Sequence, residues 1–431
     1  MGSAHRSGSE VLDLVGVGFG PSNLALAVAL TEHGRRSSVR FVERQDRFGW
    51  HRGMLLEDAT MQISYLKDLV TLRNPASPFA FLSYLHDHGR LVDFINYGSP
   101  YPTRLEFHDY LEWAASRFTD RVDYATSVVG IEPVAGEPGV LDVRTSRGDA
   151  LRTRNVVLAT GLRPHLPPGV EPGPRVWHTH DLLRRVGEIR DPRRIVVVGA
   201  GQSAAEAVDH LHRRFPEAEV RAVFARYGYS PADDSSFANR VFDPSAVDDF
   251  YRAPSAVKEM ILGYHANTNY SVVDTDLIES LYRRHYHERV SGRERLRFHN
   301  VSRVVDAVAT EDGVQVAIDS LLDGRRDVVP ADVLVYATGY RPADPCALLE
   351  RLANRFARDE SGRLRIGRDY RVATDPDLRA GIYLQGPTEH THGLSSTLLS
   401  NIAVRAGEIA ESIAAHASAA AARGLADSRP A

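Results

Sequence analysis

The sequence predicts an α/β fold with two dinucleotide-binding, Rossmann-like domains and a smaller helix-rich domain. An apolar run leads into a glycine-rich turn and then a helical pattern at Val11–Leu30, and the same order recurs at Ile195–Val208. The chain has 431 residues, which is longer than a domain with a single hydrophobic core usually is, so we expect several domains.

The first glycine-rich turn follows a predicted strand at Val11–Val15 and opens a predicted helix at Leu24–Leu30. Glycines let the backbone turn sharply and let a pyrophosphate reach the free amides of a helix N-terminus. We expect this role for Gly16, Gly18, Gly20 and Pro21, with the proline standing where the usual pattern has its third glycine. The next predicted strand, Val39–Val42, is followed by Glu43, whose carboxylate is placed to accept a ribose hydroxyl.

The second turn has the more specific pattern, G-x-G-x-x-A, over Gly199, Gly201 and Ala204. Its next predicted strand, Val220–Phe224, is followed by Arg226 where NAD-binding proteins tend to carry an acidic residue. A guanidinium there favours NADPH by pairing with the 2′-phosphate, unless it is an ordinary surface arginine. We therefore expect FAD at the first turn and NADPH at the second, with hydride passing from NADPH to the flavin.

Two apolar strands that end in Ala-Thr-Gly, Val156–Gly161 and Val333–Gly339, indicate where the chain crosses between the two domains. A helix-rich and Asn-rich segment interrupts the second domain, and the Ala-rich C-terminal segment reads as a flexible tail. The predicted boundaries are 10–165 and 330–413 for a discontinuous FAD-binding domain, 166–231 and 291–329 for an NADPH-binding domain, 232–290 for a substrate-binding insertion and 414–431 for the tail.

The composition excludes several classes of protein. A formal net charge of -4 provides no basic field for nucleic acid. Cys346 is the only cysteine, which excludes an intramolecular disulfide, a CxxC redox pair and a cysteine-based zinc cluster. The short polar segment 1–10 holds no apolar signal region and no apolar run is long enough for a bilayer, so we expect a cytoplasmic protein without a membrane partner. Two His-x-His pairs lack the spacing of a metal motif, and we expect no metal.

Lys67 and Lys258 are the only lysines among the 52 residues counted as Lys plus Arg. A lysine in such a sequence can mark a site that requires a compact ammonium group. A solvated helix face is the simpler interpretation for Lys258, whereas Lys67 lies in the largely uncharged stretch MQISYLKDLVTLRNP, which favours a functional role. Asn239 and Asn269 carry amides that suit a polar substrate, although asparagine is also a common turn residue.

Seven ordered motifs together resemble the flavin-dependent N-hydroxylating monooxygenase family, and closely the bacterial L-ornithine N5-monooxygenases. The resemblance spans about residues 10–413, and Pro21 matches this family's form of the first turn. The motifs are GVGFGPSNLALA, GWHRGM, MQISYLKDLVTLRNPASPF, GAGQSAAE, NTNYSVVD, ATGYRP and THGLSSTLLSN.

The resemblance implies a complete reaction. NADPH reduces FAD, and NADP⁺ stays bound to help protect a C4a-hydroperoxyflavin that forms with O₂. The side-chain amine of L-ornithine attacks the distal oxygen and becomes the hydroxylamine used in hydroxamate siderophores and related peptides. Family members are commonly tetramers, so the resemblance also implies a homotetramer.

The resemblance assigns roles to individual residues. Lys67 matches the lysine that pairs with the substrate carboxylate, and Asn239 matches an asparagine at the amino acid's backbone end. Asn269 matches the asparagine near the reacting amine, and Gln62 is a candidate hydrogen-bond partner of the peroxide. The other implied contacts are Trp50, His51 and Met61 with the flavin, Leu394 and Ser396 with flavin and substrate, and Gln202, Ser203 and Arg226 with NADPH.

Three alternatives remain at this point. Ornithine and lysine differ by one methylene, worth only about 1–3 kcal/mol in a pocket, so an L-lysine N6-monooxygenase stays open. A Baeyer-Villiger or S,N-oxygenating flavin monooxygenase would bind no amino-acid carboxylate and would not require Lys67. A non-catalytic flavin- or NADPH-binding sensor is the third. Neutral Asn269 favours amine hydroxylation, because a carboxylate there would hold a proton on an amine whose pKa is near 10.4.

Overall fold

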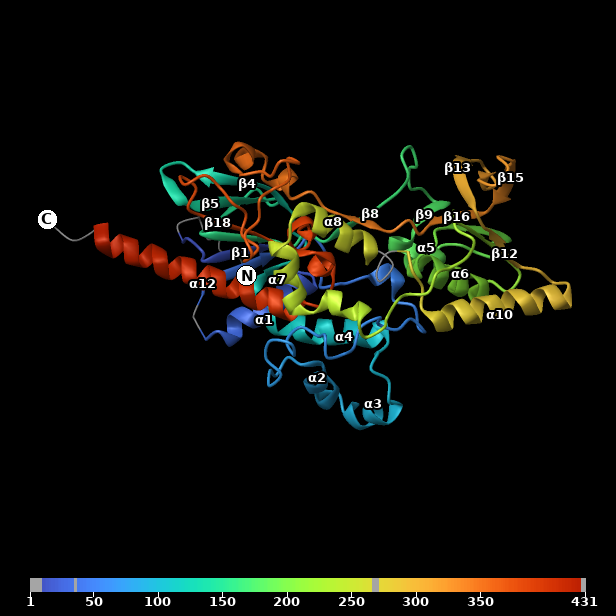
Figure 1. Ribbon diagram of the computed structural model, residues 1–431, viewed down its shortest axis with the longest axis horizontal. Coiled ribbons are helices and arrows are strands. Elements are labelled where there is room, and N and C mark those ends of the chain that lie inside the picture. The colour runs from blue at the N-terminus through green and yellow to red at the C-terminus, as the bar shows by residue number, and fades with distance from the viewer. Residues whose placement is uncertain (1–9, 35–36, 266–270, 428–431) are drawn as a thin grey trace, which may run out of the picture.

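The computed structural model describes residues 10–34, 37–265 and 271–427. Two five-stranded parallel sheets lie side by side along the long axis of the molecule, each with helices packed against it (Figure 1). The predicted α/β fold with two Rossmann-like units is confirmed. None of the helices within the described ranges is long and apolar enough to cross a membrane.

The first sheet has the strand order β18-β7-β1-β2-β3. Side chains alternate along β1, so that Leu14 joins a core beneath the helices while Val15 and Val17 join a core on the opposite face. Helix α1 (Pro21–Glu32) packs on the first face together with α12 (Ile402–Asp427). The strands are β1 (Leu14–Val17), β2 (Val39–Val42), β3 (Val122–Asp123), β7 (Asn155–Leu158) and β18 (Gly381–Leu384).

The second sheet has the order β12-β11-β10-β16-β9 and repeats this arrangement. Ile195 and Val197 of β10 face the helices, whereas Val196 faces a three-stranded antiparallel sheet. The strands are β9 (Val176–His178), β10 (Arg194–Val198), β11 (Glu219–Val223), β12 (Leu296–His299) and β16 (Val333–Tyr336), and the helices are α5 (Leu182–Val186), α6 (Gln202–Arg214) and α10 (Thr275–Ser291).

The chain crosses between the sheets at the two Ala-Thr-Gly segments. After β7 of the first sheet it forms β8 (Leu162–Pro164), and after β16 of the second it forms β17 (Tyr340–Pro342). These two short strands pair antiparallel, which joins the outgoing and returning segments. The predicted crossing points are therefore confirmed by the strand pairing.

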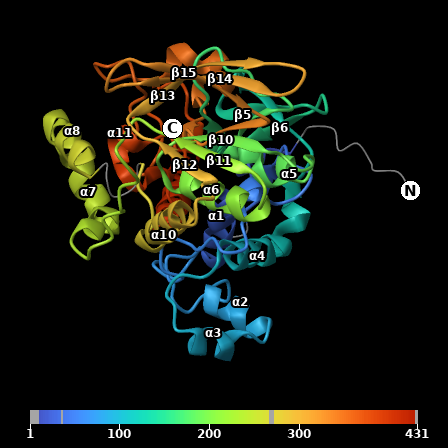
Figure 2. The same cartoon turned by 90° about the vertical axis from the view of Figure 1, so that its right-hand side faces the viewer.

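Smaller elements surround the two sheets. Figure 2 shows α7 and α8 projecting from one side of the body and α2 and α3 from another. The remaining antiparallel strands are β4 (Val128–Val134), β5 (Glu137–Thr145), β6 (Ala150–Thr153), β13 (Ser302–Ala309), β14 (Val314–Ser320) and β15 (Arg326–Ala331). The other helices are α2 (Phe81–Asp87), α3 (Leu91–Tyr97), α4 (Arg104–Ala115), α7 (Pro244–Arg252), α8 (Ser255–Tyr264) and α11 (Glu389–His392), with 3₁₀ turns η1 (Arg52–Met54), η2 (Ser116–Arg121), η3 (Thr179–Asp181), η4 (Ala238–Phe242), η5 (Pro345–Leu348), η6 (Glu350–Arg355) and η7 (Leu394–Thr397).

Two predicted domain boundaries require correction. Strand β16 lies beyond the predicted return to the first domain at residue 330, yet it pairs with β10 and β9 of the second sheet. Helix α10 lies almost entirely within the predicted insertion, yet it links the parallel strands β11 and β12 and buries Leu281 in the second core. Parallel neighbours need such a crossover helix, so α10 belongs with the second sheet and the insertion is shorter than 232–290.

The predicted flexible tail also requires correction. Helix α12 continues from Ile402 to Asp427, well past the expected end near Ile413. Ile409 and Ile413 are buried against the first core, which anchors the N-terminal half of the helix. The Ala-rich continuation remains helical because alanine has the highest helix propensity of all residues.

Candidate active site

The glycine turn after β1 is formed by Gly18 and Gly20, two residues later than the sequence interpretation placed its start. Gly18 has a φ of +84°, and a Cβ there would lie 2.5 Å from the carbonyl oxygen of Ala159. Gly16 instead lies inside β1, where a Cβ would lie 2.3 Å from the ring of Phe41. Gly16 is therefore required for strand packing, and it is not part of the turn.

The third position of the first turn is occupied by Asn23. This position corresponds to Ala204 in the second turn, while Pro21 stands at the first helical position, where the missing N–H of proline is tolerated. Asn23 is fully buried, and its Nδ2 donates to the carbonyl oxygen of Gly18 at 2.7 Å. The side-chain amide thus ties α1 to the turn, so Pro21 does not replace the third glycine.

The N-terminus of α1 has room for an anion. Gly20 caps the helix without a side-chain hydrogen bond, and a Cβ on Gly20 would meet no atom of the described residues within 4 Å. Glu43 is buried beside the turn, where its carboxylate accepts hydrogen bonds from the backbone N–H groups of Phe19 at 2.6 Å and Gln45 at 2.8 Å. These bonds fix the carboxylate, and its remaining lone pairs can accept a ribose hydroxyl.

The second turn repeats the geometry of the first. Gly199 has a φ of +141°, and a Cβ there would lie 2.4 Å from the carbonyl oxygen of Ala337. Gly201 caps α6, and the partly buried Gln202 and Ser203 form its first turn. Arg226 is exposed beyond β11, where its Nη1 donates to the carbonyl oxygen of Ser271 at 2.8 Å.

Buried polar atoms near α12 lack partners within the described ranges. These atoms are Oγ of Ser396 and both amide atoms of Asn401. Because buried polar groups are normally paired, these atoms are available to hydrogen-bond a polar molecule. Together with the open N-terminus of α1, they fit a dinucleotide with a polar ring system such as FAD.

The loop carrying Met61, Gln62 and Lys67 is held from beneath by Asp68. The buried carboxylate of Asp68 accepts hydrogen bonds from the backbone N–H groups of Val70, Thr71 and Phe81 and from the Thr71 hydroxyl. Met61 is buried in the first core, whereas the Gln62 side chain is exposed. Asp68 thereby fixes the backbone direction at the preceding residue, Lys67.

Lys67 is half-buried, and its ammonium forms no ion pair with any residue in the described part of the chain. Its Nζ lies 5.9 Å from the centroid of the Phe242 ring. Burial lowers the pKa of Lys67, and the nearby Asp243 carboxylate partly offsets that shift. A substrate carboxylate would compensate the buried charge.

Turn η4 brings two predicted substrate residues toward the same place. It contains Phe242, which contacts Lys67, and it also contains Asn239. The Nδ2 of Asn239 donates to the carbonyl oxygen of Asp234 at 2.7 Å, and within the described ranges Oδ1 has no partner, so it is available to a ligand. Turn η4 contacts η7, and η7 carries Leu394 and Ser396. The structure therefore assembles Lys67, Asn239 and the η7 residues from three distant segments.

Arg405 holds η7 in place. Its buried Nη1 donates to the carbonyl oxygens of Ser395 at 3.3 Å and Ser396 at 2.8 Å. Leu394 and Ser396 are both 2% exposed. Burial lowers the pKa of Arg405, and Nη1 of its guanidinium is hydrogen-bonded to neutral backbone carbonyl oxygens rather than to a carboxylate.

Trp50 and His51 lie where the two sheets approach each other. The Trp50 ring packs on the first core, and its centroid lies 4.7 Å from that of His51. The centroid of the His51 ring lies 5.9 Å from that of Tyr340, which follows the second crossing. Surrounding protein, together with Arg104 and His180, lowers the pKa of His51 to about 4, so the imidazole is neutral.

An interdomain hydrogen-bond network was not predicted from the sequence. Arg104 of α4 donates to both carboxylate oxygens of Glu206 on α6, at 2.9 and 2.8 Å. Gln202 donates to Glu206 at 3.0 Å and to Asp274 at 2.8 Å, and Gln62 donates to Asp274 at 3.0 Å. Glu206 and Asp274 end two of the quoted motifs, GAGQSAAE and NTNYSVVD, which was the available signal. For Arg104 the sequence contained no comparable signal, apart from its position at the start of a helix.

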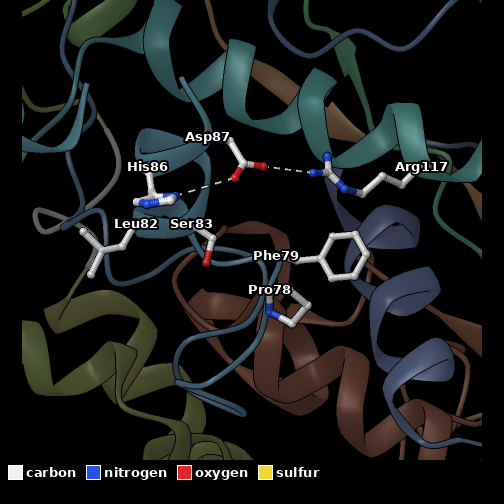
Figure 3. A pocket seen from close by; sticks show the side chains of 7 residues that line it. All are labelled: Pro78, Phe79, Leu82, Ser83, His86, Asp87 and Arg117. Atoms are coloured by element: carbon white, nitrogen blue, oxygen red, sulfur yellow. Dashed lines mark hydrogen bonds and ion pairs between the residues drawn. The ribbon is translucent and has the colours of Figure 1, made fainter. Parts of the chain in front are cut away.

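Some predicted or conspicuous features lie elsewhere. Asn269 lies outside the described residues. Within the described ranges no group of three or more potential metal ligands occurs, and His178 and His392 contact the backbone carbonyls of Gly339 and Arg368. The surface pocket in Figure 3 contains no predicted site residue and is lined by Pro78, Phe79, Leu82, Ser83, His86, Asp87 and Arg117.

Comparisons with known proteins agree with this geometry. Residues 10–342 match the family described as L-lysine 6-monooxygenase/L-ornithine 5-monooxygenase. The chain is 42% identical to the L-ornithine N(5)-monooxygenase of Pseudomonas aeruginosa over 422 residues, covering 94% of each protein.

Solved structures show the same likeness. The ornithine N-hydroxylase of Kutzneria sp. 744, in a complex with reduced FAD, NADP⁺ and L-ornithine, is 48% identical, with a TM-score of 0.92 and coverage of 94% of this chain and 99% of that one. The L-lysine 6-monooxygenase of Pseudomonas syringae is 35% identical, with a TM-score of 0.83 and coverage of 94% and 99%. The chain thus belongs to the family of L-lysine 6-monooxygenases and L-ornithine 5-monooxygenases, which are flavin-dependent N-hydroxylating enzymes.

Proposed function

We propose that this chain is an FAD- and NADPH-dependent monooxygenase that uses O₂ to convert L-ornithine to N5-hydroxyornithine. The observation that carries the proposal is the half-buried ammonium of Lys67, which faces η4 and, although the Asp243 carboxylate is nearby, forms no ion pair within the described residues. A free α-amino acid brings the carboxylate that this charge lacks. The stronger similarity to ornithine-hydroxylating enzymes supports ornithine over lysine.

The two glycine turns account for the cofactors. We assign FAD to the turn at Gly18 and Gly20, with Glu43 on its ribose. We assign NADPH to the turn at Gly199 and Gly201, with Gln202, Ser203 and Arg226 as further contacts. When bound, the two cofactors supply hydride and activate O₂; the protein residues position and shield the reacting groups.

Substrate residues set the orientation of the amino acid. Lys67 holds the substrate carboxylate, and the free Oδ1 of Asn239 accepts a hydrogen bond from the α-ammonium group. The side chain then extends toward η7, where Leu394 excludes water and the unpartnered Oγ of Ser396 offers a hydrogen bond. The reacting amine must lose its proton, and we assign Asn269 and Gln62 to that end because neutral amides do not stabilise an ammonium as carboxylates do.

Replacing Lys67 tests the carboxylate site. We expect Lys67→Ala to raise KM for ornithine by about 10- to 100-fold, the effect of losing a charge-assisted hydrogen bond, while NADPH oxidation continues. Hydroxylamine and NADPH consumption are measured in parallel. Lys258→Ala is the matched control, because Lys258 on α8 is the only other lysine. A normal ornithine KM in Lys67→Ala would contradict the assignment.

The substrate alternatives are separated by a product assay. Ornithine and lysine are compared for the fraction of NADPH that yields hydroxylamine, and ornithine should give the higher fraction. Higher coupling with lysine would identify an L-lysine N6-monooxygenase. Efficient oxygenation of a ketone or sulfide without an amino-acid carboxylate would support the Baeyer-Villiger alternative, and no oxygenated product from any of these would support a sensor.

We also propose a cytoplasmic homotetramer that supplies hydroxylamine for siderophores or related peptides. Exposed apolar side chains on the projecting α3, Val92, Ile95 and Tyr97, support an interface between copies. Light scattering measures the oligomeric state, and a monomer at micromolar concentration would contradict this part of the proposal. An N-hydroxylated amine becomes an iron-binding hydroxamate on acylation, which supports the siderophore role.

A further inference from the structure

Asp274 stands between the two cofactor-binding segments. It caps the N-terminus of α10, and its two carboxylate oxygens accept hydrogen bonds from different domains. Oδ1 accepts from Nε2 of Gln62 at 3.0 Å, and Oδ2 accepts from Nε2 of Gln202 at 2.8 Å. Gln62 belongs to the loop beside the first sheet, whereas Gln202 begins α6 of the second.

The two glutamines are held to different extents. Oε1 of Gln202 also accepts a hydrogen bond from the backbone N–H of Asp274 at 2.8 Å, so its amide is bound at both ends. Nε2 of Gln202 further donates to Glu206, which is fixed by the bidentate contact with Arg104. Among the described residues Gln62 is bound to Asp274 through Nε2 alone, and its Oε1 has no partner there.

A carboxylate at this position determines which way each amide points. An ionised carboxylate only accepts hydrogen bonds, so both glutamines must turn their NH₂ groups toward Asp274. The carbonyl oxygen of Gln62 must then point away from Asp274. An amide in place of the carboxylate would offer one donor and one acceptor, and it could satisfy only one glutamine in its present orientation.

From this pairing we propose that Asp274 is a positioning residue that fixes the amide orientation of Gln62 relative to Gln202. In this orientation Gln62 presents its carbonyl oxygen, and not its NH₂ group, to the flavin. The inference rests on the proposed function in assigning Gln62 to the flavin and Gln202 to NADPH. The inference goes beyond that function, because it concerns whether Gln62 presents its carbonyl oxygen or its NH₂ group to the flavin.

The Asp274→Asn variant tests this role with little change of shape. Gln202 keeps its orientation because it is bound at both ends, so Gln62 turns its amide and presents NH₂ in place of the carbonyl. We expect the ratio of hydroxylamine formed to NADPH consumed to fall by about two- to tenfold, the effect of one altered hydrogen bond. KM for ornithine and the FAD content should stay as in the wild type.

A double-mutant cycle distinguishes positioning from a general structural role. If Asp274 acts through Gln62, then Asp274→Asn has no further effect on coupling in a Gln62→Ala background. Equal effects of Asp274→Asn in both backgrounds would overturn the proposal. Wild-type coupling in the Asp274→Asn single variant would also overturn it, while leaving ornithine hydroxylation by the wild type intact.

A readout without turnover tests the pairing independently. The visible absorption spectrum of bound FAD responds to hydrogen-bond donors near the ring, so Asp274→Asn should shift this spectrum. In a Gln62→Ala background, Asp274→Asn should cause no such shift. NADP⁺ is titrated as a second probe, and its dissociation constant should change by less than twofold in Asp274→Asn because Gln202 stays in place. An unchanged flavin spectrum combined with much weaker NADP⁺ binding would show that Gln202 moves instead, which would overturn the proposal even without ornithine as substrate.

Discussion

The N-termini of α1 and α6 follow turns of the same geometry, but among the described residues only the second is covered by another segment. A Cβ added to Gly20 would have no described atom within 4 Å. A Cβ added to Gly201 would lie 3.4 Å from the Cα of Ser271. Gln202, the first residue of α6, is also bonded to Asp274. In the described part of the chain the first N-terminus is thus left open, while the second is overlaid by residues 271–274, just before α10.

The bodies of the two helices differ in the same way. Residues 23–30 of α1 are all buried, and they are apolar except for Asn23, so the helix is enclosed within one core. Helix α6 places Glu206, Asp209 and His212 in ion pairs or hydrogen bonds with Arg104, Arg284 and Glu288. The helix that follows the glycine turn is therefore part of the apolar core in the first domain. In the second domain the corresponding helix forms polar contacts with other segments.

The residues beyond the second strand of each unit complete the contrast. Glu43 is 5% exposed and fixed by two backbone N–H groups, whereas Arg226 is exposed and linked to Ser271. The carboxylate beyond the first turn is therefore buried and held in place, whereas the guanidinium beyond the second turn is exposed to solvent. Three sets of substitutions test this contrast directly.

The largest effects should follow replacement of the positive-φ glycines. Gly18→Ala and Gly199→Ala each force a Cβ into a left-handed conformation and to within 2.5 and 2.4 Å of a carbonyl oxygen. We expect each to lower stability by at least about 2 kcal/mol, measured by thermal unfolding. Gly18→Ala should also lose FAD, whereas Gly199→Ala should retain it and bind NADPH poorly. If Gly199→Ala released FAD as readily, the two sites would not be independent.

The sequence predicted the features that are encoded within a few residues. Glycine turns, the Ala-Thr-Gly strand ends and the position of Glu43 all depend on local backbone requirements. The register of the first turn was misjudged because five residues contain three glycines, and the pattern cannot distinguish a turn glycine from Gly16, which packs under Phe41.

Contacts between distant segments could not be predicted in this way. Gln62 and Asp274 are 212 residues apart, and no periodicity relates them. Helix α10 was grouped with the insertion because the two are contiguous, although its role is set by the strands β11 and β12 that it connects. Lys67 was identified because an isolated lysine is conspicuous among arginines, but its pairing with η4 is a tertiary contact.

An intermediate effect is expected for Arg226→Ala. Removing the exposed guanidinium should raise KM for NADPH by about 10- to 100-fold and leave KM for NADH nearly unchanged, because only NADPH carries the 2′-phosphate. Initial rates of flavin reduction with each nucleotide measure the ratio. Arg214→Ala, at the other end of α6, is the control for loss of a surface arginine. Equal effects on both nucleotides would assign Arg226 to the contact with Ser271 alone.

The smallest and most selective effects should come from Gly20→Ala and Gly201→Ala. Both glycines have ordinary extended backbone angles, with φ of -86° and -100°, so alanine fits either position without backbone strain. The added methyl group would occupy the space where a pyrophosphate approaches, and we expect about two- to tenfold weaker binding of FAD in Gly20→Ala and of NADP⁺ in Gly201→Ala. Thermal unfolding of the cofactor-free protein should not change for Gly20→Ala, since the methyl group meets no atom of the described chain within 4 Å. A methyl group on Gly201 would lie 3.4 Å from the Cα of Ser271, an ordinary van der Waals contact. A change of stability in Gly201→Ala, with none in Gly20→Ala, would therefore extend the contrast between an open and a covered helix N-terminus.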